Sequence, residues 1–172
     1  MRRILVSLGL TDVGGITARI VERLAGAALL DVVVGSIAPS LPALRALAEA
    51  DPLVRLHVDT SDMAALTAQA DIAIGAGGSS SWERCVLGLP TLLLVLADNQ
   101  TPAATALAEA GAVAALDVAE IETAFDALAA RLLGDEALRA RLSRNAADIC
   151  DGRGAERVAD RLLTRLEHPR RA

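Results

Sequence analysis

The sequence contains no lysine and no tyrosine, and tryptophan and phenylalanine occur once each among its 172 residues. A core with so few aromatic side chains must be built from aliphatic ones, and hydrophobic residues make up 53% of the chain. Alanine-rich stretches alternate with runs of valine, isoleucine and leucine. Such helices packed on Val/Ile/Leu strands favour an α/β protein over an all-β sandwich.

Basic residues are not in excess, since 17 arginines stand against 22 acidic residues and give a formal net charge of -5. Without a basic surface that could release counterions, nucleic acid is excluded as a partner. The two cysteines, Cys85 and Cys150, are too few for a disulfide framework in a chain of this length. No apolar run approaches the roughly 20 residues of a membrane helix, and the N-terminal stretch breaks too early for a signal peptide. The sequence therefore predicts a soluble, cytoplasmic protein without a membrane span.

Short apolar runs alternate with helical patterns along the chain. Because these runs are continuous, they indicate parallel strands that are buried on both faces. The expected strands are 4–8, 31–35, 54–58, 71–75 and 91–96, with a weaker one at 112–116. The expected helices are 15–27, 41–50, 63–69, 81–87, 102–110, 119–133, 136–150 and 154–166. We expect a single domain over 1–172, with 119–166 as a helical C-terminal segment.

The order of these elements predicts where a ligand binds. Right-handed crossovers turn a parallel βαβ series into a doubly wound, Rossmann-like sheet of about six strands in the order 3-2-1-4-5-6. Its topological switch point lies between the first and fourth strands, and ligands bind there at the carboxyl ends. The loops that leave those two strands, 9–15 and 75–81, are both rich in glycine. We expect them to face each other across one crevice.

The segment 71–83 is the most informative motif of the chain. An apolar strand leads into glycines and then into serines that open a helix, an arrangement that suits a phosphate. Ser80 and Glu83 permit two interpretations. They have the spacing of a capping box, or Glu83 accepts hydrogen bonds from a ribose diol. The small residues 76–78 are not needed for a cap and favour ligand binding.

Several other kinds of site are excluded or left open. The loop 9–15 matches neither G-x-G-x-x-G nor a P-loop, and no acidic residue ends the second strand, so dinucleotide and ATP P-loop sites are rejected. The segment 98–101 is either a polar turn that caps a helix or a set of groups for sugar hydroxyls. The two histidines, His57 and His168, belong to no readable catalytic or metal-ligand grouping. We therefore expect no catalytic residue, no metal and no cofactor.

Three short motifs connect this pattern to known families. They are Ser81-Trp-Glu-Arg-Cys85, Gly88-Leu-Pro90 and Leu96-Ala-Asp-Asn-Gln100. With them, most of the chain resembles the C-terminal, donor-binding half of GT-B enzymes such as the MurG-like glycosyltransferases (family 28 C-terminal domain). It resembles more closely the PseG family of UDP-sugar hydrolases from pseudaminic acid biosynthesis and the related SpsG-type spore-coat polysaccharide biosynthesis proteins. This likeness implies a nucleotide-sugar-binding domain that forms one half of a GT-B fold.

The resemblance also implies a role for individual residues in binding a UDP-sugar. The end of the third strand would hold uracil, Glu83 the ribose, the two glycine loops the diphosphate, and segment 98–101 the sugar. In that order, the implied residues are His57, Val58 and Met63; Glu83; Gly9, Thr11, Gly78, Ser79 and Ser80; and Asn99 and Gln100.

The chain departs from the family pattern in two respects. Leu10 stands where the family usually has a second glycine. The hydrolase family carries its catalytic histidine on an N-terminal domain, whereas this chain begins at the first strand of the second domain. We therefore expect an excised domain, or a subunit that acts with a separate partner. The first hypothesis for its function is the UDP-binding part of a UDP-sugar hydrolase; the alternatives are the donor half of a glycosyltransferase and a non-catalytic nucleotide-binding domain.

Overall fold

The computed structural model describes residues 2–167, so His168 lies outside the described part of the chain. The six strands are β1 (Arg3–Ser7), β2 (Leu29–Val34), β3 (Val54–Val58), β4 (Ile72–Ala76), β5 (Thr91–Val95) and β6 (Ala114–Asp117). The eight α-helices of the described residues are α1 (Ile16–Leu24), α2 (Leu41–Ala50), α3 (Met63–Gln69), α4 (Ser80–Val86), α5 (Thr101–Glu109), α6 (Ile121–Gly134), α7 (Glu136–Ile149) and α8 (Gly154–Glu167).

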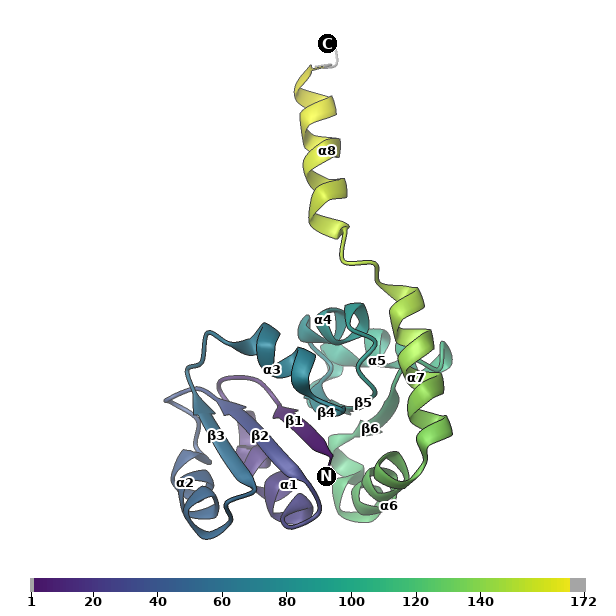
Figure 1. Cartoon of the computed structure of the whole chain (residues 1–172). Coiled ribbons are helices and arrows are strands. Elements are labelled where there is room, and N and C mark those ends of the chain that lie inside the picture. Colours follow the sequence, from purple (N-terminus) through teal and green to yellow (C-terminus); the bar gives the residue numbers. More distant parts are fainter. Residues whose placement is uncertain (1, 168–172) are drawn as a thin grey trace.

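All six strands pair in parallel in one sheet (Figure 1), and their order is β3-β2-β1-β4-β5-β6. This confirms the predicted doubly wound order. The switch point lies between β1 and β4, whose register pairs Ile4 with Ile72 and Ser7 with Gly75. The carboxyl ends of these two strands therefore lie side by side, and so do the loops that leave them.

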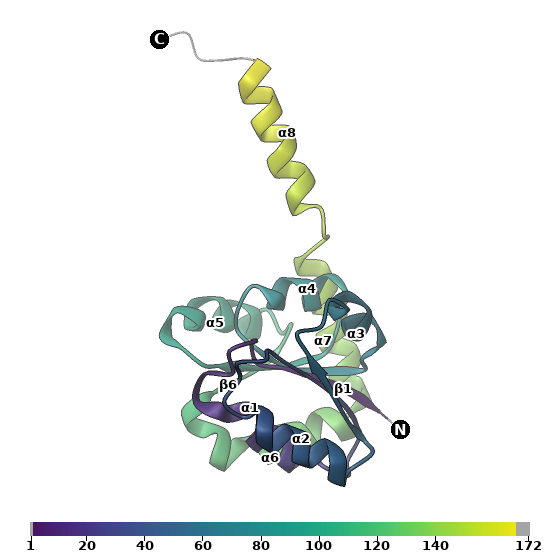
Figure 2. The ribbon, with the colours of Figure 1, turned by 90° about the vertical axis from the view of Figure 1, so that its left-hand side faces the viewer.

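Helices cover both faces of the sheet in two layers (Figure 2). Helices α1, α2 and α6 pack on one face, and α3, α4 and α5 pack on the other. Helix α7 follows α6 and contacts α4, so the chain crosses from one layer to the other along the edge of the sheet. Helix α2 before β3 lies in the first layer and α3 after β3 lies in the second. This change of layer creates the switch point between β1 and β4.

The buried strand residues alternate between two separate cores. Ile4, Val6, Leu92 and Leu94 belong to the large core under α1, α2 and α6, which also contains Phe125. Their sequence neighbours, such as Leu5 and Leu93, belong to smaller clusters on the opposite face. The central strands β4 and β5 are thus buried at every position because both faces of the sheet are covered.

Several predicted boundaries differ from the structure, most of them by one or two residues. The helix expected over 15–27 ends at Leu24, because a turn follows in which Gly26 has a φ of +73°. A residue without a side chain adopts this left-handed conformation easily and ends the helix. The weak sixth strand runs from Ala114 to Asp117, two residues later than expected at its start.

The C-terminal helices occupy different surroundings. Helix α6 packs against the sheet, and α7 packs against α6 and α4. Helix α8 projects away from the rest of the molecule (Figure 1). Residues 154–165 of α8 are all exposed, among them Val158, Leu162 and Leu163. Within residues 2–167, no helix combines the length and the apolar character that crossing a membrane requires.

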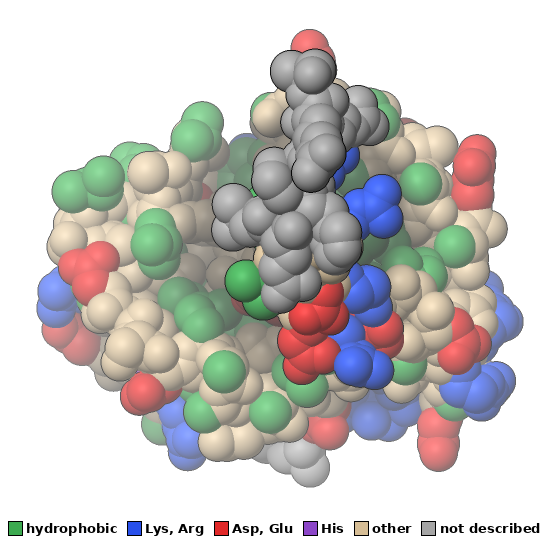
Figure 3. Space-filling model, turned by 90° about the horizontal axis from the view of Figure 1, so that it is seen from above, with side chains coloured by type: hydrophobic (Ala, Val, Ile, Leu, Met, Phe, Trp, Pro, Cys, Tyr) green, Lys and Arg blue, Asp and Glu red, His purple; other side chains and the backbone are tan. Residues whose placement is uncertain are grey.

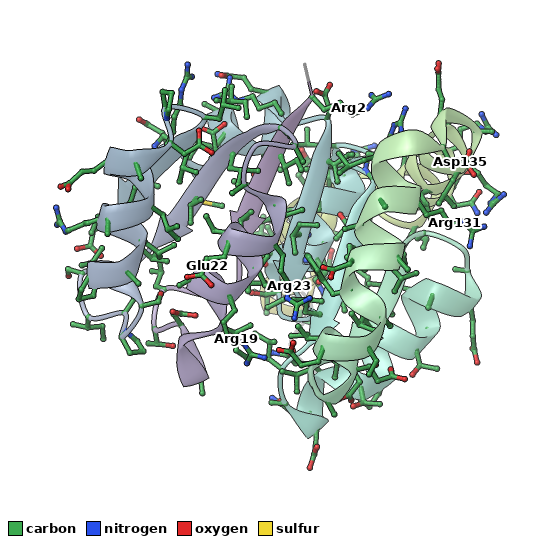
Figure 4. The ribbon with its side chains drawn as sticks, turned by 90° about the horizontal axis from the view of Figure 1, so that it is seen from below. Arg2, Arg19, Glu22, Arg23, Arg131 and Asp135 are labelled. Atoms are coloured by element: carbon green, nitrogen blue, oxygen red, sulfur yellow. The ribbon has the colours of Figure 1, made fainter. Side chains whose placement is uncertain are left out.

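Ion pairs join α1 and α6 on the face of the sheet that these helices cover. Arg19 and Arg23 of α1 point toward α6 (Figure 4), where both bind Glu122. Arg23 also contacts Asp126 at 2.8 Å. These pairs are largely solvated and join the ends of two helices in one layer, so each contributes little to stability.

Candidate functional site

A cleft of about 490 Å³ opens where the carboxyl ends of β1 and β4 meet. Figure 3 shows the molecule from the face that α3, α4 and α5 cover, where hydrophobic and uncharged side chains surround a recess. The residues that line it are Ser7, Leu8, Gly9, Leu10, Thr11, Val13, Val33, Thr60, Met63, Ala76, Gly78, Ser79, Ser80, Glu83, Leu96, Ala97 and Gln100. Both glycine-rich loops contribute to it, as the topology predicts.

The cleft contains most of the residues singled out in the sequence. Those that line it are Gly9, Thr11, Met63, Gly78, Ser79, Ser80, Glu83 and Gln100. Three others do not line it. His57 and Val58 lie on the edge strand β3, and Asn99 is an exposed residue of the turn before α5.

The first loop is fixed from below by a buried carboxylate. Asp12 is only 1% exposed and has a left-handed backbone, with a φ of 43°. Its Oδ1 accepts hydrogen bonds from the amide of Thr17 at 3.0 Å and from the hydroxyl of Thr17 at 2.7 Å. Its Oδ2 accepts from the hydroxyl of Ser40. Asp12 therefore holds the loop in place and does not face a ligand.

The second loop does not form the capping box that its sequence permits. Ser79 occupies the position before α4, and Ser80 is the first residue of the helix. The hydroxyl of Ser80 accepts a hydrogen bond from Nη1 of Arg84 at 3.0 Å, and no side chain caps the helix. The carboxylate of Glu83 is exposed and lines the cleft. Its position leaves it available to a ligand.

Arg84 is a residue of the site that the sequence reasoning missed. It is 4% exposed and donates from Nη2 to the carbonyl of Ala76 at 2.8 Å and to the hydroxyl of Ser81 at 3.1 Å. Its Nε has no hydrogen-bond partner. Burial lowers the pKa of the guanidinium to about 10, so the group remains protonated at neutral pH. A buried cation therefore lies directly under the second loop.

Gln100 joins the third loop of the site to the second. Its Oε1 accepts a hydrogen bond from the amide of Leu96 at 2.9 Å, which closes the turn after β5. A Cβ on Gly77 would lie 3.3 Å from the same oxygen and 3.2 Å from Cβ of Gln100. The amide nitrogen of Gln100 is left free to donate to a ligand, because its oxygen is used within the turn.

His57 belongs to a separate polar group on the sheet. Its Nε2 lies 2.8 Å from Oδ1 of Asp31, and Nε of Arg3 binds the other oxygen of the same carboxylate. Burial by itself would raise the pKa of Asp31, but the hydrogen bonds from Arg3 and His57 outweigh it and hold the pKa below its ordinary value. The side chain of His57 is thus hydrogen-bonded to a residue of the neighbouring strand β2.

Charge is sparse in the cleft. Among its lining residues, Glu83 is the one with an ionisable side chain. Within residues 2–167, no three His, Cys, Asp or Glu side chains are grouped so that they could hold a metal ion. The cleft can therefore offer backbone N–H groups, hydroxyls, one amide and one carboxylate to a polar ligand.

Curated proteins with related sequences point to one group of enzymes. The chain is 36% identical over 129 residues to the spore coat polysaccharide biosynthesis protein SpsG of Bacillus subtilis, which covers 73% of this chain and 38% of SpsG. It is 33% identical over 117 residues to the UDP-N-acetylglucosamine--N-acetylmuramyl-(pentapeptide) pyrophosphoryl-undecaprenol N-acetylglucosamine transferase of Salinibacter ruber, covering 65% of this chain and 32% of that protein. The chain thus spans about a third of the length of these relatives. No protein-family model matches it.

Solved structures with the same fold include several glycosyltransferases and also UDP-N-acetylglucosamine 2-epimerases. The calicheamicin glycosyltransferase CalG4 superposes with a TM-score of 0.75 at 22% identity, over 99% of this chain and 43% of CalG4. MurG of Acinetobacter baumannii gives a TM-score of 0.73 at 19% identity, over 94% of this chain and 49% of MurG. The Streptomyces glycosyltransferase SsfS6, complexed with thymidine diphosphate, gives 0.61 at 20% identity, over 85% and 36%.

The sequence relatives and the fold agree with the resemblance drawn from the motifs. The six-stranded order and the TM-scores identify a Rossmann-like half of a GT-B fold, consistent with its C-terminal domain. The chain is therefore a GT-B-type domain that is homologous to SpsG and to the MurG-like N-acetylglucosamine transferases.

Proposed function

We propose that this domain binds a UDP-sugar in the cleft between β1 and β4, as part of a nucleotide-sugar enzyme of bacterial polysaccharide biosynthesis. One observation carries the proposal: two glycine-rich loops and a free carboxylate line one cleft at the topological switch point. Ligands of open α/β sheets bind at that place. A diphosphate suits the backbone N–H groups of the loops, and a ribose diol suits the carboxylate.

The proposed roles follow from where each group lies. Gly9, Thr11, Gly78, Ser79 and Ser80 surround the diphosphate, because they lie on the two facing loops. Glu83 accepts hydrogen bonds from the ribose hydroxyls. Met63, from the start of α3, borders the base.

The remaining residues border the outer ends of the ligand. Gln100 lies at the opposite side of the cleft from β3 and donates to the sugar, with Asn99 beside it. The backbone of His57 and Val58 forms the exposed edge of the sheet and pairs with the uracil. These assignments place the nucleoside toward β3 and the sugar toward β5.

The reaction that we favour is hydrolysis of the sugar C1–O bond by an activated water. Glu83 is the one ionisable lining residue, and it is committed to the ribose in this proposal. The group that activates the water therefore comes from outside this domain, on an N-terminal domain or a partner subunit. The length of the relatives, about three times that of the matched region, leaves room for such a domain.

Transfer of the sugar to an acceptor is the second candidate. It is favoured by the similarity to the N-acetylglucosamine transferase of Salinibacter ruber and by the glycosyltransferases that share the fold. In that case this domain holds the same donor, and the other domain supplies an acceptor in place of water. A non-catalytic nucleotide-binding domain is the third candidate.

Calorimetric titration with UDP, UMP and ADP tests the proposed ligand. We expect UDP to bind more tightly than UMP, because the loops hold the diphosphate, and more tightly than ADP. The absence of binding heat with UDP at millimolar concentration would contradict the nucleotide site.

Variants of Glu83 test its proposed role. Glu83→Ala should weaken the binding of UDP far more than the binding of inorganic pyrophosphate, with Glu83→Gln as the size-matched variant. An equal loss for both ligands would assign Glu83 to the helix and not to the ribose.

Product analysis with a UDP-sugar separates the three candidates. This chain alone should release no free sugar, and the chain combined with its partner domain should release sugar without an acceptor if it is a hydrolase. A requirement for an acceptor would identify a transferase. Turnover by this chain alone would contradict the proposal that the activating group lies elsewhere.

A further inference from the structure

The buried guanidinium of Arg84 has no anionic partner in the described part of the chain. All three of its hydrogen bonds go to neutral oxygens, which belong to Ser80, Ala76 and Ser81. No ion pair joins Arg84 to any carboxylate within residues 2–167. Moving a charge out of water without pairing it is costly. The guanidinium is thus buried without an ion pair, and the nearby carboxylate of Glu83 favours its charged form only through space.

Arg84 is connected to the cleft through a small cavity. This cavity, of about 10 Å³, is lined by Arg84 together with Thr67 and several residues of β1 and β4. It shares four lining residues with the cleft, which are Ser7, Met63, Ser80 and Glu83. A single layer of side chains therefore separates the guanidinium from the space in which a ligand binds.

Ser80 is the link between the two spaces. Because its oxygen accepts from Nη1 of Arg84 at 3.0 Å, its own proton is directed elsewhere. Ser80 also lines the cleft, so this proton can be donated to an oxygen there. Hydrogen bonds that lie in series strengthen one another in a medium of low dielectric constant. The hydroxyl thereby becomes a stronger donor toward an anion than an isolated serine.

We propose that Arg84 is a positioning residue that supplies the counter-charge for the diphosphate of the ligand, acting from beneath the loop through the hydroxyl of Ser80. This inference rests on the proposed function and adds the source of its charge selectivity. Glu83 contributes a negative charge to the cleft, and no arginine lines it. A multiply charged phosphate bound there needs a cation nearby, and Arg84 is the cation that the fold holds at that point.

A purely structural role of Arg84 predicts a different result from a role in supplying charge. If Arg84 only fills space beneath the loop, its loss weakens every ligand of the cleft by the same factor. If it supplies charge, its loss selectively weakens ligands that carry phosphate. Because Arg84 forms no ion pair, its removal also leaves no buried carboxylate unpaired, and it costs the unliganded fold less than the removal of a buried arginine that is ion-paired.

The test compares UDP with uridine on Arg84→Met, which retains much of the side-chain length and removes the charge. We expect the UDP affinity of the full chain to fall at least about tenfold more than the uridine affinity, a difference of about 1.4 kcal/mol. Arg84→Lys, which keeps a charge, should retain part of the preference for UDP. Should Arg84→Met not fold, Ser80→Ala provides the second measurement, with the same selective loss of UDP affinity.

Arg139 provides a matched control. It is also buried, at 6% exposed, and it binds the carbonyls of Leu132 and Leu133 at 2.7 and 2.8 Å, away from the cleft. Arg139→Met should lower stability and leave the ratio of UDP to uridine affinity unchanged. Equal losses of UDP and uridine in Arg84→Met, or no loss, overturn the role of Arg84 while the nucleotide site stands. A wild-type chain that binds neither compound overturns the proposed function as well.

Discussion

The guanidinium of Arg84 fills the space that a side chain at Gly75 would need. An ideal Cβ on Gly75 would lie 2.5 Å from Cζ and from Nη1 of Arg84, and 2.9 Å from Nη2. Gly75 lies inside β4, where glycine is otherwise unfavourable because it leaves nothing to pack. The glycine of the strand therefore leaves the space that the buried guanidinium occupies beneath the loop 75–81.

Gly75→Ala is expected to lower the free energy of unfolding by about 1–3 kcal/mol, the usual cost of overpacking. In an Arg84→Ala background the same change should cost less, because the clash has been removed. Urea denaturation of the four proteins measures the coupling. Gly134→Ala serves as the control, because a Cβ there meets nothing within 4 Å. Equal costs in both backgrounds would show that the guanidinium does not oppose a side chain at position 75.

Asp12→Asn should destabilise the first loop. The substitution keeps one acceptor for Thr17 but puts an amide group where Oδ2 accepts from the hydroxyl of Ser40. Breaking a buried hydrogen bond to a charged group costs about 1–3 kcal/mol. Ser40→Ala removes the other partner, and the double variant should cost less than the sum of the two single changes. Strict additivity in thermal or urea unfolding would contradict a direct contact.

The group formed by Arg3, Asp31 and His57 predicts a pH dependence of stability. Its hydrogen bonds hold the pKa of Asp31 below the ordinary value of 3.8 in the folded chain. A carboxyl with a lowered pKa adds stability above the pKa of the unfolded chain and loses it as the pH falls through the folded value. Asp31→Asn should therefore be less stable than wild type by about 1–3 kcal/mol at pH 7. This deficit should shrink below about pH 4 in urea unfolding; a deficit that grows on acidification would contradict the sign.

Removal of α8 should leave the rest of the fold intact. Residues 154–165 of α8 are all exposed, so their loss uncovers no core. A helix of 14 residues in water is only marginally stable by itself. The free energy of unfolding of a chain ending at Gly152 should lie within about 1 kcal/mol of that of the full chain, as expected for changes away from packed regions. A large fall in the melting temperature would show that α8 packs on the domain in solution.

Much of the fold was predictable because hydrophobic patterns report local burial. The bounds of β3, α2 and α3 match the expected ranges 54–58, 41–50 and 63–69. The order of the strands followed from the handedness of βαβ connections, which is nearly invariant. The largest error lies at the end of α1, Leu24, where a turn residue and not the apolar pattern decides the boundary.

The site was predictable in its location and less so in its contacts. Facing glycine loops and Glu83 could be inferred from the strand order and the motif. Arg84 could not, because an arginine after a glutamate on a short helix has the pattern of a solvated charge. The signal that was available is Gly75, since a glycine inside a strand indicates that another group approaches the backbone closely.

The sequence alone determined the parallel sheet, its switch point and the two loops that meet there, because these follow from periodicity, chain order and backbone chirality. The tertiary structure decided which polar side chains are buried and what they contact. Arg84 beneath the loop, Asp12 under Ser40 and His57 against Asp31 are all such cases. The cost of burying a polar group is balanced by its hydrogen-bond partners, and for Asp12 and His57 these include residues distant in the chain that only the folded molecule brings together.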